Sequence, residues 1–243
     1  MNRAFAPFEK HSHGIICACD LDRLEDVSRV VEAIDPVEGL VGYKLGSLLS
    51  LRYGLAEAVK AVRRMTAKVL LYDHQKAGLD VPSMGAGYVA VCRDAGVDAL
   101  ILFPLGGPTV VEAFVGSTLR AGLVPVVGGA LPLEDYLVKG GGYVAGSALS
   151  RISRRAYELG ARDFIIPATD GAAIRAHVRS FAGKAPTRLF VPGIGPLGGD
   201  IGRAFAAARG LSAYAIIGRA IYADPEPGDA ARRLAGEALA FTG

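Results

Sequence analysis

The stretch VLLYDHQKAGLDVP, residues 69–82, places charged groups directly behind a short apolar run. Residues 69–72 are apolar at every position, as in a parallel strand covered on both faces, so Asp73 has to lie at the carboxyl edge of the sheet. Lys76 and Asp80 follow within seven residues, close enough for the ammonium to lie between two carboxylates and keep all three groups charged near neutral pH. Such a cluster suits electrostatic or acid–base chemistry; the alternative is a surface loop with an ordinary salt bridge.

Two further charged residues stand where other apolar runs end. Asp20 follows the run GIICAC, and Lys44 follows LVGY. If the strands are parallel, their carboxyl ends meet at one rim, and these two residues join the Asp73, Lys76 and Asp80 loop around one cavity. Three acids and two lysines are costly to take out of water unless they satisfy one another, so the pattern indicates a functional site rather than a structural role for all five.

The elements that must position these groups alternate between strand and helix. Strands are predicted at 14–19, 40–43, 69–72, 99–103, 123–127, 163–166, 188–191 and 214–217. Helices are predicted at 22–34, from Ser47 as the cap to about 62, and at 83–95, 108–119, 145–159, 171–181, 204–209 and 228–241, with 133–143 ambiguous. Right-handed crossovers place every helix outside the sheet, which predicts an α/β fold of the (β/α)8 TIM-barrel type; a doubly wound open sheet is the alternative.

Length and composition agree with one barrel. The chain has 243 residues, 51% of them hydrophobic, which predicts a single domain over 1–243 with an amino-terminal extension at 1–13. A net charge of +3 is too small and too scattered for a nucleic-acid surface. We expect a soluble, cytoplasmic protein without a membrane segment, with Cys17, Cys19 and Cys92 as small core residues. His11, His13 and His177 belong to no motif and are expected at the surface.

The last two strand ends carry a different signal. PGIGPLGG after residue 191 is a turn with few side chains, and Gly218 and Arg219 follow the final predicted strand. Barrels build phosphate sites from these two loops, where backbone N–H groups and a cation meet an anion. A glycine-rich turn alone also serves as a plain tight turn, but with an arginine in the adjacent loop it predicts phosphate binding.

These motifs together resemble the orotidine 5'-monophosphate decarboxylase family, in its archaeal style. The segments that carry the resemblance occur in order from residue 14 to about 230: ACDL, VGYKLGS, the Asp73/Lys76/Asp80 loop followed by Val81 and Pro82, PATD, PGIGPLGG and IIGRAIYADPEP. The resemblance implies a TIM barrel, usually a homodimer with its active sites at the subunit interface. It also implies conversion of orotidine 5'-monophosphate to uridine 5'-monophosphate (UMP) and CO2 in pyrimidine biosynthesis, without metal or cofactor.

The resemblance also implies a role for each charged residue. Lys44 and Asp73 would begin a lysine–aspartate network, Lys76 would donate the proton, and Asp80 would come from the neighbouring subunit. The substrate-binding positions would be Asp20 at the ribose and, at the phosphate, Gly193, Gly195, Gly218 and Arg219. A cation next to the pyrimidine C6 is most stabilising when the carbanion has formed there, which favours Lys76 as the main catalytic group.

The sequence departs from the family pattern in four places. The family spaces its loop as Asp-x-Lys-x-x-Asp, whereas here one more residue stands on each side of Lys76. Leu197 stands where the family often has Gln. Val81, Pro82, Ser83 and Met84 follow Asp80 where the family often has Ile-Pro-Asn-Thr, so a threonine contact with the substrate is either missing or supplied by Ser83. The serine that reads the pyrimidine after the fifth strand has no clear counterpart in VVGGALP.

Two other functions fit parts of the pattern. One is a magnesium-dependent decarboxylase or aldolase of the same superfamily acting on a sugar phosphate, in which Asp73 and its neighbours would hold the metal. The other is a non-catalytic barrel that binds a nucleotide phosphate. Sensitivity to a chelator distinguishes the first, and separate measurements of binding and turnover distinguish the second.

Overall fold

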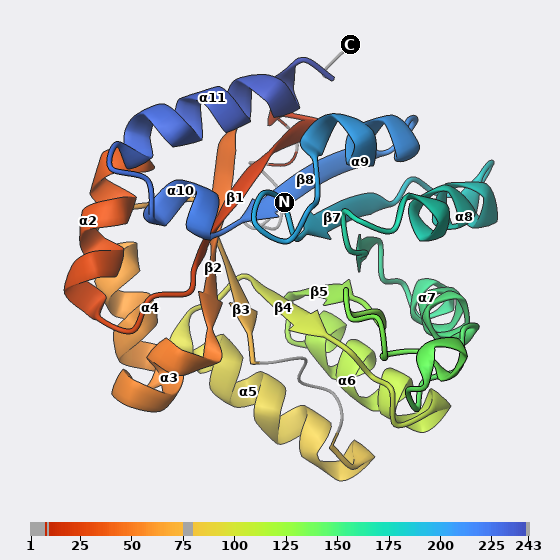
Figure 1. Ribbon diagram of the computed structural model, residues 1–243. Helices are drawn as coiled ribbons and strands as arrows, with labels where there is room; N and C mark the ends of the chain where they lie inside the picture. Colours follow the sequence, from red (N-terminus) through yellow and green to blue (C-terminus); the bar gives the residue numbers. More distant parts are fainter. Residues whose placement is uncertain (1–7, 9, 75–79, 242–243) are drawn as a thin grey trace.

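The computed structural model describes residues 8, 10–74 and 80–241 (Figure 1). Within them, parallel strands close into a barrel in the order β1-β2-β3-β4-β5-β6-β7-β8, which confirms the predicted TIM barrel and excludes the open sheet. The strands are β1 (His13–Cys19), β2 (Leu40–Gly46), β3 (Val69–Asp73), β4 (Ala99–Leu102), β5 (Val124–Val127), β6 (Asp163–Ile165), β7 (Arg188–Pro192) and β8 (Ser212–Ile217). No helix in this part of the chain is both long and apolar enough to span a bilayer.

Helices surround the barrel, as Figure 1 shows. They are α2 (Leu24–Ile34), α3 (Ser47–Tyr53), α4 (Leu55–Arg63), α5 (Gly85–Ala95), α6 (Pro108–Arg120), α7 (Ala148–Glu158), α8 (Gly171–Phe181), α9 (Ile201–Ala207), α10 (Arg219–Tyr222) and α11 (Pro227–Leu239). Two 3-10 turns, η2 (Pro82–Met84) and η3 (Val138–Gly140), complete the described elements, the second in the segment whose prediction was ambiguous.

The predicted helix from Ser47 to about residue 62 is two helices. Gly54 separates α3 from α4 with φ 78° and ψ 142°, a conformation in which glycine carries no steric penalty. Ser47 is the first helical residue rather than the cap, since Gly46 occupies the cap position. Helix α9 starts three residues earlier than predicted because the Asp200 carboxylate caps it, accepting from the Arg203 N–H at 2.8 Å.

Two hydrophobic layers follow from the alternation of side chains along the strands. One lies between the strands and the helices and includes all three cysteines, which are buried and free, as predicted. The other fills the barrel interior with residues such as Ile16, Val69, Leu71, Phe190 and Ile216. Because side chains alternate with period two, the interior position that follows Leu71 is Asp73, at the carboxyl rim.

The amino-terminal segment covers the opposite end of the barrel. The Phe8 ring packs edge-on against Phe190 and Tyr214, with centroid distances of 5.8 Å and 4.8 Å. The Tyr214 hydroxyl donates to the His11 carbonyl at 2.8 Å, which fastens this segment to β8. Phe8 is 7% exposed and belongs to the interior layer, so that layer is continuous up to this end.

The expectation that His177 lies at the surface is wrong. Helix α8 directs it inward, where it is 6% exposed and its ring lies 4.8 Å from Phe164 and 4.6 Å from Phe181, measured between centroids. Its Nε2 atom has no hydrogen-bond partner among the described residues, and burial lowers the pKa of the imidazole to about 4. An isolated histidine in a sequence gives no sign of such burial.

We therefore expect His177 to weaken the fold in mild acid. The unfolded chain binds a proton at this residue below about pH 6.5, whereas the folded chain binds it only near pH 4. The free energy of unfolding therefore falls by up to about 3 kcal/mol as the pH drops through this window. Urea unfolding of wild type and His177→Phe from pH 7 to pH 4 measures how each free energy of unfolding depends on pH. If the two free energies fall by the same amount, His177 is not the group responsible.

Candidate active site

A charged layer stands directly above the interior core at the carboxyl rim. Lys44 pairs with Ala18 on β1 and Leu71 on β3, and Asp73 pairs with Gly46, two residues further along β2. Asp20 follows the end of β1. Each of these side chains continues the inward-facing register of its strand, so the strand pairing itself brings the three together, as the sequence predicts.

The ammonium of Lys44 lies between two carboxylates. Its Nζ atom is 2.7 Å from Asp20 Oδ1, a hydrogen bond, and 3.6 Å from Asp73 Oδ2. Lys44 is 7% exposed and Asp73 is 4% exposed, whereas the Asp20 side chain keeps 45% of its surface in solvent. The cluster is therefore buried at the β2–β3 side and open to water at Asp20.

Burial alone would lower the pKa of Lys44, but the attraction of Asp20 and Asp73 outweighs it, and the pKa stands above its ordinary value. The lysine is thus a permanent cation at neutral pH. Because it already fills the gap between Asp20 and Asp73, a metal ion would have to displace it. The described residues contain no group of three His, Cys, Asp or Glu side chains suited to hold a metal.

Gly46 makes room for this arrangement, and sequence reasoning gave it no role. A Cβ atom at this position would lie 2.8 Å from Asp20 Oδ1 and 3.9 Å from Lys44 Nζ. A contact under 3.0 Å forces the carboxylate to move. The glycine in VGYKLGS is the sequence feature that marks the position, but only the register between β1 and β2 explains it.

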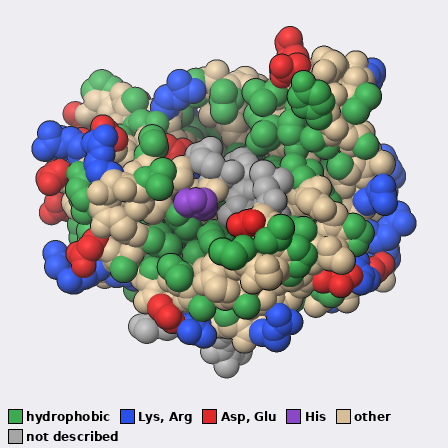
Figure 2. All heavy atoms as spheres, turned by 90° about the horizontal axis from the view of Figure 1, so that it is seen from below, with side chains coloured by type: hydrophobic (Ala, Val, Ile, Leu, Met, Phe, Trp, Pro, Cys, Tyr) green, Lys and Arg blue, Asp and Glu red, His purple; other side chains and the backbone are tan. Residues whose placement is uncertain are grey.

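The cluster forms one wall of a cavity of about 290 Å³ at the carboxyl end of the barrel. The wall across from it is apolar and includes Leu131, Ile165, Ile194 and Leu197. Pockets of this kind, mostly apolar with a few convergent charged groups, are typical of small-molecule sites. Figure 2 shows hydrophobic side chains gathered over much of the same end of the molecule.

The glycine-rich loop after β7 holds its shape through its own hydrogen bonds. Gly193 and Gly195 have φ of 94° and 82°, values that other residues rarely adopt. The Gly195 N–H donates to the Gly199 carbonyl at 3.0 Å, and the Gly199 N–H donates to the Gly193 carbonyl at 2.9 Å. In this structure Gly195 thus shapes the loop, and its N–H is already engaged.

Gly218 and Arg219 close the rim after β8, and both line the cavity together with Gly193. The ring of Tyr222 packs against Gly218, where a Cβ would lie 3.3 Å from the ring carbon Cε1. Arg219 is exposed, so its guanidinium is available to an anion that enters from solvent. Tyr222 and Phe103 also line the cavity, and nothing in the sequence singled them out.

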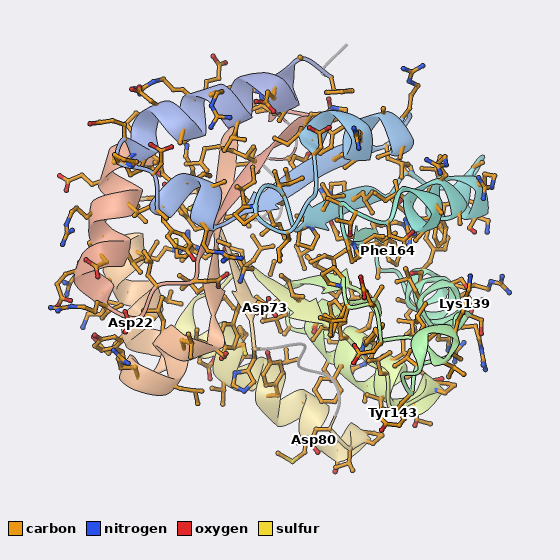
Figure 3. All side chains as sticks on the ribbon, in the orientation of Figure 1. Asp22, Asp73, Asp80, Lys139, Tyr143 and Phe164 are labelled. Carbon is orange, nitrogen blue, oxygen red and sulfur yellow. The ribbon has the colours of Figure 1, made fainter. Side chains whose placement is uncertain are left out.

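Of the remaining two predicted residues, only Asp80 lies within the described part of the chain, and it does not join the cluster. Lys76 lies in 75–79, outside the described residues. Asp80 is exposed, and its Oδ1 accepts from the Val81 N–H at 2.7 Å. In Figure 3 Asp73 lies near the centre of the barrel, whereas Asp80 lies at the periphery, near α5.

A closed parallel barrel with a buried lysine–aspartate cluster and a glycine-rich rim defines the general class of this protein: a (β/α)8 barrel with a candidate site at its carboxyl face. The family model for the Orotidine 5'-phosphate decarboxylase / HUMPS family matches residues 14–234. The chain therefore belongs to this family.

Individual relatives support the same family assignment. The chain is 32% identical to the orotidine 5'-phosphate decarboxylase of Thermobifida fusca, over 92% of this chain and 94% of the relative. It is 28% identical to that of Methanosarcina barkeri, over 88% and 86%. Among solved structures, the Methanocaldococcus jannaschii orotidine 5'-monophosphate decarboxylase complexed with inhibitor BMP superposes with a TM-score of 0.78 at 19% identity, covering 93% of this chain and 98% of that one.

Proposed function

We propose that the protein decarboxylates orotidine 5'-monophosphate to UMP and CO2, a carboxy-lyase reaction of pyrimidine biosynthesis. The observation that carries the proposal is the Lys44 ammonium held between Asp20 and Asp73 at the barrel mouth, in a chain of this family. The reaction needs fixed charges where negative charge moves from a carboxylate to a ring carbon. The proposal includes no metal or cofactor, and it takes the chain as one barrel domain with a short extension, acting in the cytoplasm.

In the proposed mechanism the bond between C6 and the carboxylate carbon breaks, and its electron pair stays on C6. CO2 departs, and a proton from the Lys76 ammonium forms the new C6–H bond, so one proton is consumed for each UMP formed. Lys44, 3.6 Å from Asp73 Oδ2, helps to hold that carboxylate beside the reacting group. The largest contribution comes from the cation next to C6, because negative charge is concentrated there only in the transition state.

The other proposed contacts hold the substrate away from the reacting carbon. Asp20, the solvent-exposed acid of the cluster, would accept from the ribose hydroxyls. Arg219 and the backbone at Gly193, Gly195 and Gly218 would bind the phosphate, Gly195 through the loop it shapes. Binding energy from this remote group can order the site for the reaction.

The direct test is to mix the purified protein with orotidine 5'-monophosphate and follow the ultraviolet change, with and without a chelator. Turnover that a chelator leaves unchanged is expected. Turnover that requires added magnesium would favour the metal-dependent relative, and tight binding of UMP without any turnover would favour the non-catalytic barrel.

Gly46→Ala is expected to lower kcat/KM about tenfold, because misplacing a group of the site by a fraction of an ångström is costly. The new methyl group would push Asp20 off Lys44. Stability should fall modestly, since displacing Asp20 weakens the ion pair that offsets the burial of Lys44. The control is Gly236→Ala on α11, whose new Cβ would have nothing within 4 Å. Equal kcat/KM values for Gly46→Ala and wild type would contradict the assignment.

We also propose that two copies associate, with Asp80 of each completing the site of the other. Asp80 lies away from Lys44 and Asp73 within one chain. Large apolar side chains are exposed on α3, η2, α5 and the residue before η2: Leu48, Leu51, Val81, Met84 and Val91. An exposed apolar patch of this kind is typical of an interface.

Leu51→Glu is therefore expected to shift the protein from dimer to monomer in sedimentation, and to lower its activity most at low protein concentration. Leu51 is 74% exposed, so the change should leave the fold intact. Val138→Glu, at a 62% exposed residue of η3, serves as the control. Wild-type sedimentation as a monomer at assay concentrations would rule out the dimer.

A further inference from the structure

A chain of hydrogen bonds runs along the outside of the barrel from α3 to the end of β3. The Ser50 hydroxyl donates to the Ser47 carbonyl at 3.0 Å, with the Gly46 carbonyl 3.4 Å away. The Ser50 Oγ atom lies 2.7 Å from the Tyr72 hydroxyl, and that hydroxyl also bonds to His74 Nδ1. Three side chains thus connect the first turn of α3 to the residue that follows Asp73.

The position of each proton along this chain follows from its first member. A carbonyl oxygen can only accept, so with the Ser50 proton directed to the Ser47 carbonyl at 3.0 Å, Ser50 accepts from Tyr72. The Tyr72 proton is then used, and its oxygen has to accept from His74. Burial raises the pKa of Tyr72, so its hydroxyl stays protonated. Reversing the direction would leave a Ser50 lone pair facing two carbonyl oxygens.

This argument fixes the tautomer of His74. Nδ1 carries the hydrogen, and when the ring is neutral Nε2 is the acceptor. The imidazole is the terminal donor of the chain, with its ring 5.6 Å from that of Tyr72 and 6.4 Å from that of Tyr88 on α5, measured between centroids.

The chain flanks the most buried acid of the site. Tyr72 and His74 are the neighbours of Asp73 in sequence, and they bond to each other on the outer side of the strand. The Asp73 side chain points the other way, into the barrel, where its Oδ2 lies 3.6 Å from Lys44 Nζ. Joining residues on both sides of Asp73 restricts rotation of its backbone and hence the direction of its carboxylate.

We infer that Ser50, Tyr72 and His74 are positioning residues that hold Asp73 in its catalytic orientation, with His74 acting through its Nδ1–H donor. None of the three touches the substrate in the proposed mechanism. The inference rests on the proposed decarboxylase function, because its effect on kcat is measured in that reaction.

Two substitutions of His74 separate the two ring nitrogens. The amide nitrogen of asparagine can occupy the place of Nδ1, whereas that of glutamine lies nearer the place of Nε2. His74→Asn should keep kcat within about threefold of wild type, and His74→Gln should lower it about tenfold with little change in KM, since misorientation acts on the chemical step. Equal activity of the two variants, or the reverse order, would overturn the inference.

Tyr72→Phe and Ser50→Ala interrupt the chain at its other links. Each should lower kcat about tenfold, and the double variant should be no worse than either single one, because one broken link already releases Asp73. Thermal unfolding within a few degrees of wild type would show that the loss is not one of folding. If the losses in kcat multiply in the double variant, the two residues act independently, which would contradict a single hydrogen-bond chain.

A spectroscopic measurement tests the chain without using the reaction. Nitrogen-15 NMR of the histidine rings should show His74 as the Nδ1–H tautomer in wild type and a mixture in Tyr72→Phe. An Nε2–H tautomer in wild type would overturn the inference. If wild type fails to decarboxylate orotidine 5'-monophosphate while the tautomer is as expected, the proposed function fails and the hydrogen-bond chain stands.

Discussion

Lys76→Ala is expected to lower kcat by about 10³-fold or more while changing the affinity for UMP only a few-fold. The variant removes both the proton that C6 receives and the cation that stabilises the carbanion, and each effect alone is typically worth about 10²-fold or more. The proposed phosphate and ribose contacts are untouched, so nucleotide binding should persist. Single-turnover decarboxylation and UMP titration by calorimetry measure the two quantities separately.

Lys60→Ala is the matched control, because Lys60 is an exposed lysine on α4 that pairs with Glu57 and does not line the cavity. It should leave both kcat and UMP affinity unchanged. If Lys76→Ala keeps wild-type turnover, another group donates the proton and the proposed role of Lys76 is wrong. If wild type and variant bind UMP equally and neither turns over substrate, the protein is a binder.

Lys44→Met is expected to lower kcat/KM by about 10³-fold and to destabilise the fold. Removing the ammonium leaves Asp73, at 4% exposure, without the cation that lies 3.6 Å away. Removing one partner of a buried ion pair typically costs about 3–5 kcal/mol, less here because Asp20 reaches solvent. Urea unfolding and steady-state kinetics at pH 7 measure the two effects.

The pH dependence of this loss has a definite sign. The pKa of Lys44 is raised in the folded protein, so its stabilising contribution is complete below its ordinary pKa of 10.5 and declines as the pH rises further. The stability difference between wild type and Lys44→Met should therefore be constant at neutral pH and shrink in strong alkali.

Adding Asp73→Asn to Lys44→Met should restore stability but not activity; restored activity would show that the charges are dispensable.

Much of the barrel and part of its site could be predicted from the sequence, because their signals are local. The first three apolar runs each end in a charged residue at the rim, and this spacing predicts that Asp20, Lys44 and Asp73 meet. Their contact distances depend on the register between β1, β2 and β3, which no single strand contains.

What could not be predicted depends on contacts between distant segments. The burial of His177 arises from packing against Phe164 on another element, and the role of Gly46 arises from Asp20 on the neighbouring strand. The Ser50–Tyr72 bond joins residues 22 positions apart. The family spacing around Lys76 likewise gives no geometry for the longer loop seen in this sequence.

Phe8 covers the amino end of the barrel, and this affects how substrate enters and products leave. With the interior filled from Phe8 up to the charged layer, substrate, UMP and CO2 must all use the same opening at the opposite end. Entry of a new substrate then has to wait for the previous nucleotide to leave. UMP should consequently inhibit by pure competition, and no kinetic sign of a ternary complex with both nucleotides should appear at any concentration.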